Sequence, residues 1–344
     1  MKKRSDKNIK AHISEDPAEI FAVMDKCAAL RRDFPEGTLP WPFGEDMLSL
    51  LKKGNPLSQR YYFIEKGGSY AFFTVYTNKM DLFTFGRARL MMKIQTVAFP
   101  CSLSCGGYIT NDLRFMLGYI KTIRGCKLVL NLPEPVSIKG MSRGETLPTC
   151  KLTLLPCHTD TEAYLNSLRS PYRRRINLAV KKCGDITVRQ INNGSINIHP
   201  LYLQTFSRSD YKLEQLEQVF FDRVEGDRLV FMKNGEPAGF VLLKQNGSEL
   251  VFMLCGMDYR YETADLYYYM LLRIVDYAIA HGCSTIDFGQ TSEKTKLKFG
   301  AVLEKRFFCA HHSNPLLNLA AMAGKHILEY KYSFPEFHVF KGEK

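Results

Sequence analysis

The segment from Cys283 to Ala301 gathers residue types that are used in acid–base and phosphate chemistry. A carboxylate (Asp287), an amide (Gln290) and two lysines (Lys296 and Lys298) follow a short run of strand-forming residues. The β-branched and aromatic residues over 285–288 favour a strand, and the glycine at 289 permits a tight turn. Because ligands tend to bind beyond strand ends in α/β sheets, we predict a functional site at this strand exit.

Residues 287–289 also spell Asp-Phe-Gly, a metal-binding tripeptide of protein kinases. A kinase additionally needs a histidine-arginine-aspartate catalytic loop and a glycine-rich loop over the nucleotide phosphates. The sequence contains neither pattern. The tripeptide therefore does not indicate a kinase.

Length and charge limit the organisation and the ligands of the chain. A chain of 344 residues exceeds what one hydrophobic core usually supports, so we expect two domains. The hydrophobic fraction of 45% agrees with compact folding, and the formal net charge of +12 favours anionic ligands. Nucleotides, coenzyme A, RNA and acidic lipid surfaces all fit that charge, which does not choose among them.

Cysteine spacing and hydropathy address the compartment and possible metal sites. The 10 cysteines are scattered through apolar patterns without a leader peptide, which favours reduced thiols and a cytoplasmic location. Cys101 and Cys105 have no partner pair at zinc-finger spacing, so we expect no metal site. No segment reaches the roughly 20 apolar residues that a membrane-spanning helix needs. The apolar stretch Pro315 to Ala323 is compatible with a peripheral contact with a membrane surface or with a helix packed on its own domain.

The first half of the chain predicts a curved antiparallel sheet with flanking helices. Its expected elements are helices over 17–31 and 111–124 and strands over 61–65, 70–76, 89–99 and 127–132. Proline and glycine recur between Pro133 and Pro148, which indicates a linker. We therefore expect domains at 1–150 and 151–344.

The second half gives sharper signals in a similar order. Its expected elements are a helix from Ser170, a strand over 185–191, helices over 198–206 and 213–223, a meander over 228–233, 239–245 and 249–258, a helix over 263–281, and strands over 285–288 and 302–309. Both meander turns carry Asn-Gly, which suits tight hairpins. Gly282 is placed to end the long helix.

The stretch from about 170 to 310 resembles the GNAT-like domain of the Fem family and related acyltransferases. The motifs that carry the resemblance are YRRRINLAVKK, GEPAGFVLL, LYYYMLLRIVDYAIAHG and DFGQTSEKTKLKFGA. Family members usually contain two such domains in tandem. The resemblance therefore implies an α+β fold with two tandem GNAT-like domains, each a mixed, mostly antiparallel sheet flanked by helices.

The resemblance also implies where an acyl donor would bind. GNAT enzymes hold the donor pyrophosphate with backbone amides at the start of the helix after the third meander strand, here at Met257 to Asp265. This junction lacks the usual glycines, so Arg260 and Thr263 would have to serve with Met257. Alternatively, Thr263 simply caps the helix.

The lysines near the strand exit receive roles by position. Lys296 matches the lysine that Fem-like families place before a phenylalanine-glycine pair, where it would neutralise a phosphate or stabilise an oxyanion. The alternative for Lys296, and more so for Lys298, is a solvated helix face.

Four other residues complete the expected site. Asp287 would orient Lys296 or accept a proton from the attacking amine, or else cap the turn. Tyr268, one of three consecutive tyrosines, would donate a proton to the leaving thiolate, and Gln290 would contact substrate. Arg173 would grip a phosphorylated donor or the backbone of a transfer RNA, unless its helix face is merely solvated.

The expected function is acyl transfer from a thioester donor, with acyl-CoA as the first choice, to an amine acceptor. The donor would act as a co-substrate, with no tightly bound cofactor. One alternative is a Fem-type transferase that uses aminoacyl-tRNA and a cell-wall precursor. A second alternative is a non-catalytic GNAT-fold module that binds an anionic metabolite or partner.

Overall fold

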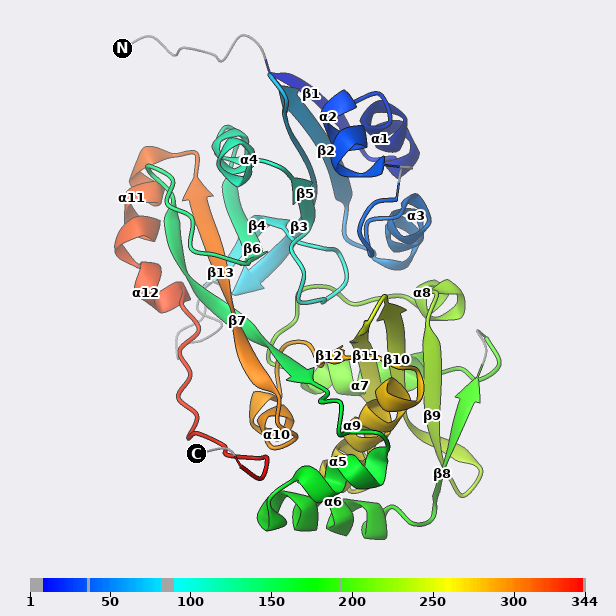
Figure 1. The fold of residues 1–344 in the computed structure, drawn as a ribbon. Helices are drawn as coiled ribbons and strands as arrows, with labels where there is room; N and C mark the ends of the chain where they lie inside the picture. Colours follow the sequence, from blue (N-terminus) through cyan, green and yellow to red (C-terminus); the bar gives the residue numbers. More distant parts are fainter. Residues whose placement is uncertain (1–8, 36–37, 82–89, 192–193, 343–344) are drawn as a thin grey trace. The chain divides into compact units, whose positions relative to one another are not determined.

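The computed structural model describes residues 9–35, 38–81, 90–191 and 194–342 (Figure 1). Its internal contacts divide the chain into two compact units. Unit 1 contains Met1–Thr146, Leu213–Leu216 and Lys305–Lys331, and unit 2 contains Leu147–Lys212, Glu217–Glu304 and Tyr332–Lys344. The predicted boundary at residue 150 falls within a strand that runs from one unit into the other.

Unit 1 is built on a mixed sheet with helices on both faces. Its strands are β1 (Lys10–Ser14), β2 (Gln59–Lys66), β3 (Ser69–Asp81), β4 (Met91–Val97), β5 (Tyr108–Thr110), β6 (Cys126–Leu132), the first part of β7 (Ser142–Thr153) and most of β13 (Val302–His312). Its helices are α1 (Pro17–Met24), α2 (Ala28–Asp33), α3 (Glu45–Gly54), α4 (Leu113–Ile120), α11 (Pro315–Ala323) and α12 (Lys325–Leu328). The predicted strand over 89–99 corresponds to β4, and Arg89 lies outside the described residues.

Alternate side chains of β2 and β3 point to the helices on opposite faces of the sheet in unit 1. Tyr62 and Phe73 stack on each other in the core cluster that includes Met116 and Ile120 of α4. Phe72, which points to the opposite face, contacts the ring of Phe21 in α1. Because both faces are covered, successive residues of these strands are buried instead of alternating with polar ones.

Unit 2 contains the elements that the sequence predicts most sharply. Its helices are α5 (Thr161–Ser167), α6 (Ser170–Lys182), α7 (His199–Arg208), α8 (Gln218–Arg223), α9 (Thr263–Ala280) and α10 (Glu293–Leu297). Its strands are β8 (Ile186–Ile191), β9 (Asp227–Lys233), β10 (Glu236–Asn246), β11 (Glu249–Met257) and β12 (Thr285–Asp287). The last part of β7 and the first residues of β13 also belong to it. The predicted meander and long helix are confirmed as β9–β10–β11 and α9.

The sheet of unit 2 has the strand order β7-β12-β11-β10-β9-β8. Helices α5 and α6 contact α9, and α7 contacts β11 (Figure 1). Gly256 of β11 permits that approach, because a Cβ there would lie 2.5 Å from the backbone of Leu201 and Tyr202 in α7. A side chain at 256 would therefore separate α7 from the sheet.

The expected helix over 213–223 begins only at Gln218, and the expected linker before residue 150 is wrong. The expected linker over 133–148 contains the start of β7 at Ser142, which includes Gly144 and Pro148. Turn-forming residues were misleading there because sheet pairing, which is not visible in sequence, determines the strand. The stretch Pro315–Ala323 does form a helix, but α11 buries none of its residues.

Candidate functional site

In unit 2 the neighbouring strands β11 and β12 pair over only part of the length of β11. Their parallel pairing joins Glu249, Leu250 and Val251 to Thr285, Ile286 and Asp287. Strand β11 then continues to Met257, whereas β12 ends at Asp287. Residues Phe252–Met257 thus form an edge of β11 that is unpaired on the β12 side, within the part of the chain that the structure describes; we call it the open edge.

A bulge marks the beginning of the open edge. The register of β11 against β10 changes where Leu242 faces Leu254 and Leu243 faces Phe252, which leaves Met253 as the extra residue. Such bulges re-aim backbone groups and are frequent beside active sites. Here the bulge lies just beyond the last β12 pair, so the backbone of β11 changes direction where the two strands part.

The loop from Phe288 to Ser292, which we call the exit loop, leaves β12 beside the open edge. The Oδ1 atom of Asp287 accepts hydrogen bonds from the Thr149 hydroxyl (2.6 Å) and the Gly289 amide (2.8 Å). Gly289 has φ +72°, and Thr291 and Ser292 also lie in the left-handed region, at φ 64° and 52°. Non-glycine residues there cost roughly 1–3 kcal/mol each, so this loop is held in shape by its surroundings.

Lys296 of α10 provides much of that support. Its side chain is buried, and its Nζ donates to the carbonyl oxygens of Gly289 (3.1 Å) and Gln290 (2.8 Å). Burial lowers the pKa of Lys296, although the nearby Cys150, Cys255 and other acidic groups oppose that shift. The structure therefore brings Lys296, Asp287 and Gln290 together at the strand exit, where Lys296 is not on a solvated face.

The tyrosine of α9 that faces this cluster is Tyr267. Its hydroxyl shares a hydrogen bond with Ser292, and burial raises its pKa well above the usual value, with a further contribution from Cys255. Tyr268 lies elsewhere, against Phe299 (ring centroids 5.7 Å apart) and under the Arg175 guanidinium (3.9 Å). Three consecutive tyrosines point in three directions around a helix, and the sequence alone does not show which direction faces the site.

Two cysteines near Lys296 are unsuited to nucleophilic catalysis. Burial raises the pKa of the Cys150 thiol to about 12 and that of the Cys255 thiol to about 11. Lys296 lowers both pKa values, but by less than burial raises them. Because the thiolate is the reactive form, neither side chain is prepared to form a covalent intermediate at neutral pH.

The start of α9, where a donor pyrophosphate was expected, is occupied by protein groups. The amide of Met257 donates to the Thr205 hydroxyl (3.0 Å). Arg260 forms ion pairs with Asp258 and Glu236. The N-cap residue is Glu262, not Thr263: its carboxylate accepts from the Ala264 amide at 3.0 Å, and Thr263 is the first helical residue.

Other cations near α9 also have carboxylate partners. Arg175 and Lys182 of α6 both contact Asp265, each at 2.8 Å. Burial tends to raise the pKa of Asp265, but hydrogen bonds from these two cations lower it overall.

Arg173, the expected ligand-binding arginine, instead donates to Asn166 of α5. Lys298 is the C-cap residue of α10 and is partly exposed.

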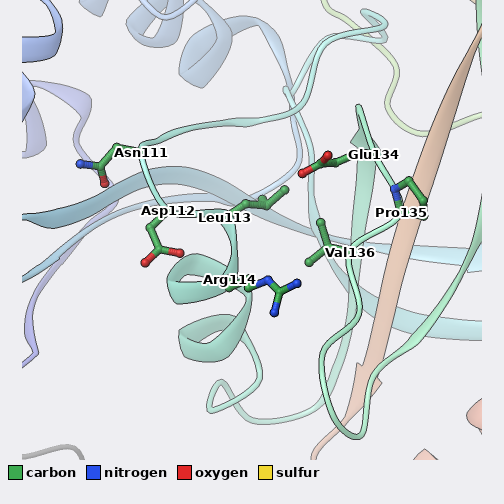
Figure 2. Close-up of a pocket in the computed structure, with 7 residues that line it drawn as sticks. All are labelled: Asn111, Asp112, Leu113, Arg114, Glu134, Pro135 and Val136. Atoms are coloured by element: carbon green, nitrogen blue, oxygen red, sulfur yellow. The ribbon is translucent and has the colours of Figure 1, made fainter.

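A pocket in unit 1 contains none of the expected site residues. It has a volume of about 340 Å³ and lies between the start of α4 and the segment 134–136. Figure 2 shows that Arg114 and Glu134 extend toward the space between these elements. Asn111 and Asp112 also line the pocket, but they hold the backbone of Tyr70 and Phe115. Among the described residues, no group of three or more His, Cys, Asp or Glu side chains is arranged to hold a metal ion.

Comparisons with known proteins agree with the arrangement in unit 2. Residues 204–297 match the family model of the acetyltransferase (GNAT) domain. A search of curated proteins found no match. The solved structures that resemble the chain include a tandem GNAT protein from the clavulanic acid biosynthesis pathway, with 11% identity, a TM-score of 0.50 and coverage of 89% of this chain and 99% of that one.

Two further solved structures have similar coverage. The C-terminal domain of a putative lysylphosphatidylglycerol synthetase from Agrobacterium fabrum has 12% identity and a TM-score of 0.48, over 90% of this chain and 94% of that one. FemX has 14% identity and a TM-score of 0.46, over 90% of this chain and 99% of that one.

The match to the tandem GNAT protein concerns the fold, and the family model covers the segment that forms the open edge and the exit loop. The predicted α+β fold with tandem GNAT-like units is confirmed. Residues 204–297 of the chain thus match a GNAT acetyltransferase domain, and the fold resembles that of a tandem GNAT protein.

Proposed function

We propose that unit 2 transfers an acyl group from a thioester donor, with acyl-CoA as the first choice, to an amine acceptor at the open edge of β11. The observation that carries this proposal is the end of β11–β12 pairing at Val251 and Asp287, followed by the bulge at Met253. Backbone groups of an unpaired strand edge bind extended chains as an added strand would. The pantetheine arm of acyl-CoA, which carries amide groups, fits such an edge, with the acyl carbonyl near the exit loop.

The neighbouring side chains support direct transfer. The amine nitrogen attacks the acyl carbon, the carbon–sulfur bond breaks, and the thiolate takes up a proton as the nitrogen loses one. The buried charge of Lys296 favours the oxyanion that forms on the acyl oxygen. Tyr267 is bonded to Ser292 of the exit loop, whereas Tyr268 packs against Phe299 and Arg175, so Tyr267 is the better placed proton donor to the thiolate.

Asp287 fits a supporting role in this scheme. Its Oδ1 holds the exit loop through Thr149 and Gly289, which fixes the carbonyl groups that Lys296 contacts. We assign Asp287 first to positioning, and proton acceptance from the amine remains its alternative role. The raised thiol pKa values of Cys150 and Cys255 favour a ternary complex over an acyl-enzyme intermediate.

The test is amine-dependent thiol release by the full-length chain. A panel of acyl-CoA donors is incubated with and without a panel of primary amines, and free thiol is followed with a chromogenic disulfide reagent. We expect thiol release that requires both substrates and a product that contains the acylated amine. Binding of donors without thiol release for any donor–amine pair would instead support the non-catalytic module.

One observation favours a second candidate, the Fem-type transfer from aminoacyl-tRNA to a cell-wall precursor. At the start of α9, the Glu262 carboxylate accepts a hydrogen bond from the Ala264 amide, which would otherwise be available to a pyrophosphate. Arg260 forms ion pairs with Asp258 and Glu236. These carboxylates disfavour the phosphates of coenzyme A at this helix. Charged transfer RNA with radiolabelled amino acid and a muropeptide precursor tests this donor, and label transfer without any acyl-CoA turnover would select it.

A further inference from the structure

Helix α11 of unit 1 exposes large apolar side chains to solvent. The exposed fractions are 77% for Leu316, 50% for Leu317, 65% for Leu319 and 38% for Met322. We call these four residues the α11 patch. Single exposed leucines are ordinary on protein surfaces, but four such side chains on one nine-residue helix that buries none of its residues are not.

The polarity of α11 is the reverse of that of a helix that packs on its own domain. Asn318 is the residue that attaches the helix: its side chain donates to the Gly140 carbonyl (2.9 Å) and accepts from the His312 amide (2.9 Å). Leu316, Leu319, Ala320 and Ala323, spaced three and four apart, are all exposed. A polar side chain thus faces the protein while an apolar stripe faces outward.

The first turn of α11 is prepared for a nonpolar environment. The Oδ1 atom of Asn314 accepts from the amides of Leu316 (2.9 Å) and Leu317 (3.3 Å). Pro315, at the first helical position, has no amide hydrogen to satisfy. No charged residue occurs from Ser313 to Gly324. Moving this turn out of water therefore leaves few backbone donors without a partner.

Basic residues lie on the segments that contact or follow α11. The segment of Gly140, which binds Asn318, also carries Lys139, whose carbonyl accepts from Lys121. Gly125 exchanges hydrogen bonds with Ser313 just before α11, and its neighbour Arg124 is exposed. Lys325 follows immediately at the start of α12. The nearby carboxylate of Glu329 is paired with His326.

We propose that the α11 patch inserts peripherally into an anionic lipid surface, with Arg124, Lys121, Lys139 and Lys325 at the level of the headgroups. An apolar helix face with basic residues beside it is the combination that binds such interfaces. The apolar stripe alone would also fit a protein partner. The cations beside it favour a surface that is anionic outside and nonpolar beneath, as a lipid bilayer is. No helix within the described ranges is long and apolar enough to cross a membrane, so this contact is interfacial.

Vesicle co-sedimentation of the full-length chain tests the proposal. We expect binding to vesicles that contain phosphatidylglycerol, weaker binding to phosphatidylcholine alone, and a loss of affinity at raised salt. The double variant Leu316→Glu/Leu319→Glu should reduce binding to anionic vesicles by at least about tenfold. Leu178→Glu is the matched control, because Leu178 is an exposed leucine (46%) on helix α6 of unit 2.

The variants change exposed side chains, and their folding is checked by thermal unfolding. Anionic-vesicle binding that the double variant leaves unchanged would overturn the proposal, as would no binding of the native chain. Self-association of the native chain in sedimentation velocity, abolished by the double variant in the absence of vesicle binding, would assign the α11 patch to a second copy of the chain instead.

Discussion

Replacing Glu214 with glutamine tests a buried carboxyl group that the folded state keeps protonated up to about pH 7. Glu214 lies in the segment Leu213–Leu216, which belongs to unit 1, and it is 5% exposed. The hydroxyls of Ser102 (2.7 Å) and Tyr76 (3.4 Å) donate to its two oxygens. Burial raises its pKa from 4.5 to about 7, although these hydrogen bonds act in the opposite direction.

The sign of the pH effect follows from where the proton is bound. Between about pH 4.5 and 7 the folded chain holds a proton on Glu214 that the unfolded chain has released, so stability falls as pH rises through this range. A shift from 4.5 to about 7 corresponds to a cost of about 3 kcal/mol above pH 7. Glutamine is neutral at every pH and has nearly the same shape, so it removes this cost.

Urea unfolding of both proteins across this pH range measures the effect. We expect Glu214→Gln to resemble the native chain near pH 4, below both pKa values, and to gain about 3 kcal/mol relative to it by pH 8. Other titrating groups cancel in the difference between the two proteins. Glu225→Gln, at a position where the side chain is 82% exposed, serves as a control and should show little pH dependence. A difference between native and Glu214→Gln that is constant with pH would refute the reasoning.

The remaining predictions concern the candidate site. Lys296→Met should lower kcat/KM by roughly 10²-fold, whereas Lys296→Arg should retain more activity because it keeps the positive charge; equal losses would argue against an electrostatic role. Tyr267→Phe should lower kcat more than Tyr268→Phe, and the pH profile of kcat should change only for the former; the reverse order would favour Tyr268 as the proton donor. Cys255→Ser should keep substantial activity, and neither the native chain nor the variant should carry a covalent acyl group in mass spectra, since burial raises the pKa of this thiol to about 11. Abolished turnover would indicate nucleophilic catalysis.

The fold of unit 2 could be predicted because its signals are local. Asn234 and Gly235 have φ values of 52° and 84°, which is the left-handed turn that the Asn-Gly pair favours. Gly282 has φ 67° just past the end of α9. Each of these elements is determined mainly by residues next to each other in the chain. In contrast, β7 passes through a segment rich in turn residues. It could not be predicted from that segment because its pairing partners in β12 are distant in sequence.

The same distinction applies to the site. Asp287, Gln290 and Lys296 are close in sequence and meet at the exit loop, as the strand-turn-helix pattern indicates. The pairing of Arg260 with Glu236 depends on how the hairpin of β10 and β11 is folded, so an arginine that looked able to bind phosphate is neutralised. The orientation of Tyr267 depends on the rotation of α9 about its axis, which a run of tyrosines does not reveal.

The arrangement at α9 bears on how a donor would be recognised. A helix start attracts phosphate through its partial positive charge and its unpaired amides. Here Glu262 uses one amide and adds negative charge, and Met257 donates its amide to Thr205. The open edge of β11 and its bulge nevertheless remain. If transfer occurs at this edge, donor affinity must therefore depend more on the pantetheine arm along β11 than on a pyrophosphate at α9. Truncated thioesters that keep the pantetheine arm but lack the nucleotide should then lose little affinity relative to acyl-CoA, and a large loss would place the phosphate contacts elsewhere in the chain.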